Sequence, residues 1–129
     1  MRLQPPPSKD KYFYRCWSVA HSWCQSCGVP ASKADWGLET HHMIKQHRAH
    51  EACVLLRLCN RCHNAAEGHR VVVDGLPWPR LSIGICLTLK LTREPSAVDW
   101  DRCKQLRGSN LPDLEPVPEI IEQSYRKWR

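Results

Sequence analysis

Two short stretches decide the fold: CQSCG at residues 24–28 and LCNRCH at residues 58–63. Each contains a Cys-x-x-Cys pair, and 31 residues, 28–58, lie between the pairs. A Cys-x-x-Cys turn presents two thiolates to one side of a metal ion, and tetrahedral Zn²⁺ takes four ligands. We therefore expect one structural Zn²⁺ held by Cys24, Cys27, Cys59 and Cys62, with the intervening chain folded back between the pairs.

The size and composition indicate one globular domain. The chain has 129 residues, 42% of them hydrophobic and 25% charged, and a formal net charge of +6. A chain of this length has room for only a modest core, so bound zinc would contribute to its stability. The basic surplus favours an anionic partner such as nucleic acid.

Eight cysteines in a chain of this size indicate either disulfides or bound metal. Residues 1–15 contain no apolar run of the kind found in a secretory signal, and no stretch has the length of a membrane span. We therefore expect a cytoplasmic protein that binds metal and has no membrane partner. The other four cysteines have no partner at ligand spacing, so we expect them to be buried thiols, with disulfides as the alternative: Cys16, Cys53, Cys86 and Cys103.

The predicted organisation has three parts. Residues 1–11 are polar and proline-rich and are expected to be flexible, residues 12–110 form the domain, and residues 111–129 form a proline-rich tail ending in a short helix. Residues 12–23 are either a helix or an aromatic plug. The core, residues 24–68, is expected to contain a strand at 38–44, a loop at 45–52, a strand at 53–58 and a helix from an Asn60 cap to Glu67. Residues 80–93 fit either a helix or a strand, and a helix is favoured because Pro79 suits a helix start; a further helix is expected at 98–107.

The histidines between and after the cysteine pairs suggest a second site. Five of the seven histidines lie between residues 41 and 63. His41 and His42 are adjacent, so on a strand their rings point to opposite faces. His63 directly follows Cys62 and would point from the helix toward the strands. Histidines in this arrangement could hold a metal or serve as a base, although a histidine pair is also common as surface polar residues.

Residues 24–67 resemble the HNH endonucleases of the ββα-metal class, in the four-cysteine zinc subgroup common in phage and bacterial genomes. The stretches that carry the resemblance are CQSCG, ETHHMIKQH and LLRLCNRCHNAAEG, in that order. The resemblance implies a small α+β fold in which a ββα-metal core is held together by the four-cysteine zinc site, with additional helices C-terminal to it. It covers about a third of the chain, and it implies residence in a bacterial or phage-infected cytoplasm.

The resemblance also implies roles for the histidines in phosphodiester hydrolysis. His41 and His63 match the ligands of a single catalytic divalent metal, which Asn64 or Glu67 could complete, and His42 matches the general base. The metal would be Mg²⁺ or Mn²⁺, with Zn²⁺ or Ni²⁺ as alternatives, and the products would carry 5′-phosphate and 3′-hydroxyl ends. A neutral imidazole is suited to take a proton from water near neutral pH.

One position departs from the family pattern. The family's middle asparagine falls at Val54, which cannot make the hydrogen bonds that orient the base; His50 or nearby backbone could replace it. The leading hypothesis is therefore a DNA endonuclease or nickase. The alternatives are a catalytically weak or silent zinc-binding DNA-binding or adaptor protein and a zinc-ribbon scaffold.

Basic residues around the proposed site are candidates for phosphate contacts with DNA, although each could equally be a solvated surface charge. They are Lys45, His47, Arg48, Arg57, Arg61 and Arg70. The sequence leaves the oligomeric state open between monomer and homodimer.

Overall fold

The computed structural model describes residues 10–44 and 49–129. It is a small α+β protein with two two-stranded antiparallel sheets and five α-helices among these residues. The α-helices are α1 (Lys11–Ala20), α2 (Asn60–Ala66), α3 (Ile83–Arg93), α4 (Trp100–Arg107) and α5 (Glu119–Trp128). The strands are β1 (Leu38–His42), β2 (Leu55–Cys59), β3 (Val72–Val73) and β4 (Leu76–Pro77), and short 3₁₀ turns occupy η2 (Ala31–Lys33), η3 (Ala52–Val54) and η4 (Pro95–Ala97).

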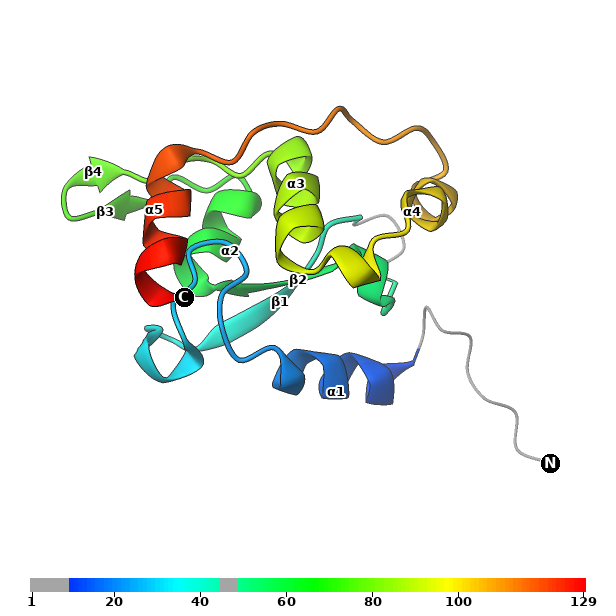
Figure 1. Cartoon of the computed structure of the whole chain (residues 1–129), viewed down its shortest axis with the longest axis horizontal. Helices are drawn as coiled ribbons and strands as arrows, with labels where there is room; N and C mark the ends of the chain where they lie inside the picture. The colour runs from blue at the N-terminus through cyan, green and yellow to red at the C-terminus, as the bar shows by residue number, and fades with distance from the viewer. Residues whose placement is uncertain (1–9, 45–48) are drawn as a thin grey trace.

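The sheet of β1 and β2 is the centre of the molecule (Figure 1). The strands pair antiparallel from Leu38 opposite Cys59 to His42 opposite Leu55. In both views α1 lies on one side of this sheet, and α2 and α3 lie on the other. Because both faces are covered, β2 is buried along nearly its whole length, with Leu55, Leu56 and Leu58 fully inaccessible.

The expected strand, strand and helix around residues 38–67 are present, with shifted ends. The first strand ends at His42 rather than Ile44, and residues 52–54 form a 3₁₀ turn, so the second strand begins at Leu55. Asn60 was expected to cap the helix, but it is the first helical residue. Cys59 is the cap, and its sulfur accepts a hydrogen bond from the Cys62 N–H. The second Cys-x-x-Cys turn and the helix start are therefore one structure.

The flanking segments also form helices. For residues 12–23 a helix and an aromatic plug were both open: residues up to Ala20 belong to α1, and residues 21–23 lie beyond its end. The first turn of α1 is capped by Asp10, which accepts from the Phe13 N–H at 3.0 Å. The helix expected from residue 80 begins at Ile83, because Ser82 and not the region of Pro79 supplies the cap. The helix expected at 98–107 begins at Trp100.

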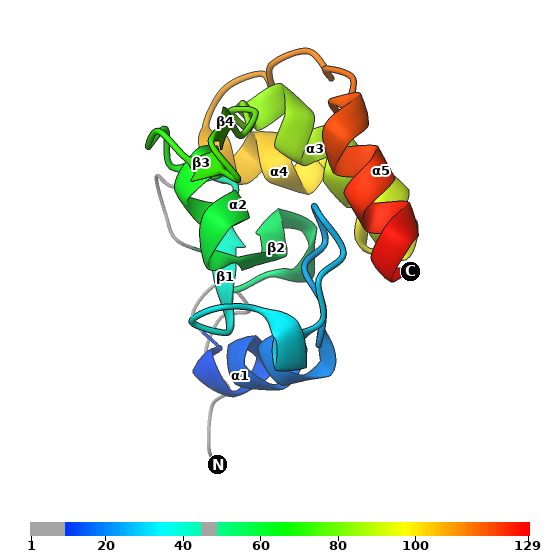
Figure 2. The same ribbon diagram turned by 90° about the vertical axis from the view of Figure 1, so that its left-hand side faces the viewer.

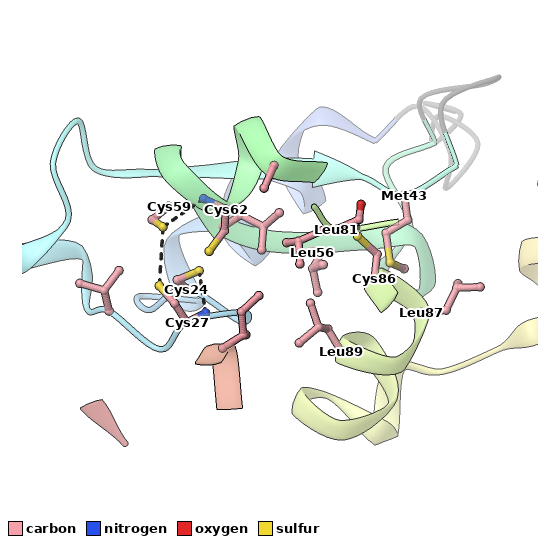
Figure 3. Close-up of a cluster of buried hydrophobic side chains, with 14 residues drawn as sticks. Cys24, Cys27, Met43, Leu56, Cys59, Cys62, Leu81, Cys86, Leu87 and Leu89 are labelled. Atoms are coloured by element: carbon pink, nitrogen blue, oxygen red, sulfur yellow. Dashed lines mark hydrogen bonds between the residues drawn. The ribbon is translucent and has the colours of Figure 1, made fainter. Parts of the chain in front are cut away.

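The proline-rich C-terminal segment packs on the domain. Ile121 of α5 is fully buried in the same core cluster as the four site cysteines and leucines of β2 and α3. Figure 3 shows the cysteines at one end of that cluster and Leu81, Leu87 and Leu89 at the other. A second cluster joins Ile44, Val54, Cys103 and neighbouring residues, so α4 packs against the segments that follow β1 and precede β2.

None of the helices in the described ranges is both long enough and apolar enough to span a bilayer.

Candidate metal centres

The four cysteines of the two Cys-x-x-Cys pairs come together in one buried cluster. Their sulfur atoms all lie within 4.8 Å of one another, and the Sγ atoms of Cys27 and Cys59 are 3.7 Å apart. Four sulfurs placed about 2.3 Å from a tetrahedral Zn²⁺ would be about 3.8 Å from one another. The cluster is therefore compatible with structural zinc, as the sequence predicted.

Local backbone geometry prepares the first pair for this role. The N–H groups of Ser26 and Cys27 both point to the Cys24 sulfur at 3.4 Å. Gly28 follows at φ 83°, a left-handed conformation that a glycine adopts without strain, and it lies against Tyr125 so closely that a Cβ would come within 3.0 Å of that backbone. The Gln25 N–H donates to the Arg57 carbonyl at 2.7 Å, so the first pair is held between β2 and α5.

The chemistry of the donor set also fits a cation. Burial raises the pKa of the Cys24 thiol well above its usual range, because a thiolate in this position is cut off from water. Four thiolates can share such a pocket only around a positive ion. Arg61 lies beside Cys27 and adds positive charge at the edge of the cluster.

The other cysteines do not join this cluster. Cys16 is exposed, while Cys53, Cys86 and Cys103 are buried free thiols, and none belongs to a group of potential metal ligands in the part of the chain that the structure describes. The sulfur of Cys103 points to the carbonyl oxygen of Cys53 at 3.4 Å. Three of these four cysteines are thus buried thiols, as expected, and Cys16 is the exception.

A second group of potential ligands lies where β1 meets α2. Oε1 of Glu67 is 3.3 Å from Nδ1 of His41 and 3.2 Å from Nε2 of His63. Two ligands at right angles about 2.1 Å from an ion are about 3.0 Å apart, so one divalent cation could be held by these three side chains. Unlike the cysteines, this group is only partly enclosed: His41 is buried, whereas the side chains of His63 and Glu67 are 22% and 29% exposed.

A second layer of polar residues orients His63. The Glu39 carboxylate accepts a hydrogen bond from His63 Nδ1, and Asn60 Nδ2 donates to the same carboxylate at 3.3 Å. The bond from His63 lowers the pKa of Glu39, which keeps the carboxylate ionised. A carboxylate on the far nitrogen of an imidazole fixes its tautomer and leaves the other nitrogen to face a metal.

His42 lies on the opposite face of the sheet from His41. Its ring stacks on Tyr14 of α1, with ring centroids 5.5 Å apart and an interplanar angle of 11°. Its Nε2 is 3.2 Å from Nδ1 of His50, whose ring also lies 4.5 Å from that of Tyr14. In the described chain β2 is the only strand paired with β1, and the sheet lies between His42 and the His41–His63–Glu67 group.

The remaining predicted residues have different surroundings. Val54 is fully buried and offers no polar side chain. Asn64 donates from Nδ2 to Asn60 Oδ1 at 3.2 Å, so its amide contacts the second layer. The Arg57 guanidinium makes contacts within the fold: it donates to the His21 carbonyl at 3.2 Å and to Thr40 Oγ1 at 3.0 Å.

The other cationic residues proposed for DNA contacts fall into two groups. Arg61 lies over the Trp78 ring at 4.6 Å, and Arg70 is exposed at the rim of a groove beside α2. Lys45, His47 and Arg48 lie outside the described residues.

Two residues that contribute to the histidine sites, Glu39 and Tyr14, were not predicted from the sequence. Glu39 lies two residues before His41, and alternation along a strand was a signal that both side chains face α2. Tyr14 gave no such signal, because only the packing of α1 on the sheet brings it to His42.

Searches with this chain found no matching family model, curated protein or solved structure.

Proposed function

We propose that the protein is a metal-dependent DNA endonuclease or nickase of the HNH type. The observation that carries the proposal is the meeting of His41, His63 and Glu67 beside a four-cysteine cluster, with His42 next to His41 in the same strand and on the opposite face of the sheet. The resemblance of residues 24–67 to HNH endonucleases supports the same reaction.

His41, His63 and Glu67 would hold the catalytic cation. A divalent ion there would supply Lewis-acid stabilisation of the leaving oxygen. Two imidazoles and one carboxylate leave coordination positions open, which a phosphate needs and which a closed four-cysteine site lacks. Glu39 acts through His63 as a positioning residue.

His42 is the proposed general base. It accepts a proton from the attacking water while the water oxygen forms a bond to phosphorus and the bond from phosphorus to the 3′ oxygen breaks. The leaving oxygen takes a proton from solvent and becomes the 3′-hydroxyl, while the phosphate remains on the 5′ end. Contacts with His50 and Tyr14 hold the His42 ring, and they take over the orienting role for which Val54 has no suitable group.

The test is nicking of supercoiled plasmid by the zinc-loaded protein with added Mg²⁺ or Mn²⁺. We expect His42→Ala to lower the rate by at least about 100-fold, the usual contribution of a general base. His50→Ala is expected to have a smaller effect, because the base would remain.

His69→Ala is the matched control, because His69 is an exposed histidine outside both clusters. Its rate and melting temperature should equal those of the unchanged protein. Purified protein that nicks no DNA form with either ion, or a His42→Ala variant as active as the unchanged protein, would refute the proposal.

The second candidate is a zinc-binding DNA-binding or adaptor protein that does not cut. It is favoured by the buried, apolar Val54 at the family's asparagine position. This candidate predicts salt-sensitive DNA binding without cleavage and one tightly bound metal per chain rather than two. Metal analysis after dialysis against Mn²⁺ separates the two.

A further inference from the structure

An open groove of about 560 Å³ lies beside α2, next to the face of the helix that carries the histidine group. Its walls come from the turn before β1, from α2, from the start of the β3–β4 hairpin and from the end of α5. In Figure 2 this side of the molecule faces the viewer, with the turn before β1 below α2 and the end of α5 to the right. The residues that matter for its chemistry are Lys33, Trp36, Asn60, Arg61, Arg70 and Trp128.

The charge in the groove favours an anion. Lys33, Arg61 and Arg70 are cationic, whereas Asp35 is the only acidic residue among the described residues that line it. Lys127 adds a further positive charge 5.8 Å from the Trp128 ring. Cations spaced along an open groove suit a phosphate backbone, which they neutralise while releasing counterions.

Trp36 is the least expected residue of the groove. It is 89% exposed, and its φ of 66° lies in the left-handed region, which a bulky residue rarely adopts. The Gly37 N–H donates to the Ala34 carbonyl at 3.1 Å, so Trp36 occupies the third position of a tight turn, where glycine is favoured. The fold thus holds a large aromatic ring in water on a strained backbone, an arrangement found mainly at functional positions.

The groove adjoins the proposed catalytic site through α2. Asn60 and Asn64 line the groove, and His63 and Glu67 lie on the neighbouring row of the same helix. Asn60 also donates to Glu39, which binds His63. A chain bound along the groove would therefore pass within one helix width of the histidine group.

We propose that this groove binds an unpaired DNA strand, with a base stacked on Trp36 and the phosphates along Lys33 and Arg70. An exposed tryptophan offers a flat apolar surface to a base that has left its duplex, and the paired bases of a duplex do not present their faces. Trp128, 37% exposed, provides a second stacking surface. The preferred substrate is then DNA with a single-stranded segment beside the scissile bond. This substrate preference rests on the proposed function, whereas strand binding does not.

The experiment measures binding of a fluorescein-labelled oligothymidylate of about 12 nucleotides, a length within the usual site sizes of such grooves, by anisotropy without added Mg²⁺ or Mn²⁺. We expect Trp36→Ala to weaken binding about tenfold, since one stacked base contributes about 1–3 kcal/mol. Trp36→Phe should restore most of the affinity. Arg70→Ala should weaken binding and reduce its dependence on salt concentration.

Two controls separate stacking from general attraction. Tyr12→Ala removes an aromatic ring that is 77% exposed on α1, outside the groove, and should leave strand affinity unchanged. Polyglutamate of similar length is the competitor that carries charge without bases, and it should displace the strand only at much higher concentration.

The proposal is overturned if Trp36→Ala binds the strand as tightly as the unchanged protein. It is also overturned if polyglutamate competes as well as DNA, which would indicate an acidic protein partner, or if a blunt duplex binds as tightly as the single strand. Because no cleavage is measured, these outcomes are independent of the nicking assay: a protein that never nicks can still bind strands through Trp36, and an active nuclease can fail this test.

Discussion

The two clusters of potential metal ligands share α2, which carries Cys62 and His63, but differ in ligand type and in enclosure. The four cysteines are all buried, and their sulfurs surround one point. The group of His41, His63 and Glu67 has one buried member and two that reach the surface. A closed set of four ligands is typical of a structural metal, and an incomplete, accessible set is typical of a catalytic one.

This difference indicates separate roles for the two clusters: the closed one would stabilise the fold, and the open one would carry the chemistry. The buried cluster joins the segment after α1, the end of β2 and the start of α2, so one ion would link parts of the chain that are far apart in sequence. The open cluster lies between two elements that are already fixed by that link. Changes to the first should therefore affect the fold, and changes to the second should affect chemistry alone.

The largest expected effect follows from breaking the closed cluster. Cys27→Ala, or removal of zinc by a strong chelator, should abolish the cooperative thermal transition seen by circular dichroism, because metal binding and folding are coupled in such a site. Cys16→Ser, at an exposed cysteine, is the matched control and should melt like the unchanged protein. Glu67→Gln should stay folded and lose only a weakly bound second metal. If Cys27→Ala melts normally, zinc is not structural.

The second prediction tests whether metal alone holds the first cysteine pair. Glu94 at the end of α3 pairs with the fully buried Lys90 and with His21, and Arg93 donates to the Gln25 carbonyl at 2.9 Å. Glu94→Gln removes the charge that faces a buried ammonium, and such a loss costs about 3 kcal/mol of unfolding free energy. Urea denaturation of the zinc-loaded protein measures this loss. No change would mean that zinc alone secures this end of the fold.

The effect of Glu94 should also depend on pH. Burial opposes ionisation, but the bonds from His21 and Lys90 outweigh it and lower the pKa of Glu94 to about 2 from an ordinary value of 4.5. Because the folded pKa is lowered, the stabilisation is fully present above about pH 4.5 and is lost as the pH falls toward 2. The stability difference between the unchanged protein and Glu94→Gln should be constant above about pH 5 and shrink below it.

The third prediction concerns the open cluster alone. Glu39→Gln keeps the size of the side chain but removes the charge that orients His63, and losses of this kind lower metal affinity or activity about 10-fold to 100-fold. The nicking rate and its dependence on Mn²⁺ concentration measure the effect. The melting temperature should not change by more than a few degrees, since Glu39 is 38% exposed. An equal loss of stability and activity would show that the two clusters are not separate.

How much of this arrangement could be predicted from sequence differs between the clusters. The cysteine spacing was sufficient for the closed cluster, because two Cys-x-x-Cys turns allow few other uses. The resemblance to HNH endonucleases predicted His41 and His63 as one group, and helix spacing allowed Asn64 or Glu67 to complete it. The contacts of His42 with Tyr14 and His50, in contrast, depend on how α1 docks on the sheet. The docking of α1 depends on contacts between residues far apart in the sequence, which local sequence patterns do not encode. The cap at Cys59 was missed because asparagine is the commoner cap residue.

The smallest expected effect extends the comparison to the groove beside α2. Trp36→Gly relieves a left-handed backbone that costs a bulky residue about 1–2 kcal/mol, while the added freedom of glycine in the unfolded chain costs about 0.5–1 kcal/mol. Because Trp36 is 89% exposed, little packing is lost. We expect unfolding free energy to rise by roughly 0.5 kcal/mol while strand binding weakens.

Trp36→Ala keeps the positive φ without the ring and is the control for this change. It should lose binding without gaining stability, because the strain remains. Measuring the unfolding free energy and the strand affinity of both variants decides whether the strained backbone positions the Trp36 ring for strand binding. If Trp36→Gly is less stable than the unchanged protein, the ring contributes to packing, and the backbone strain has no connection with strand binding.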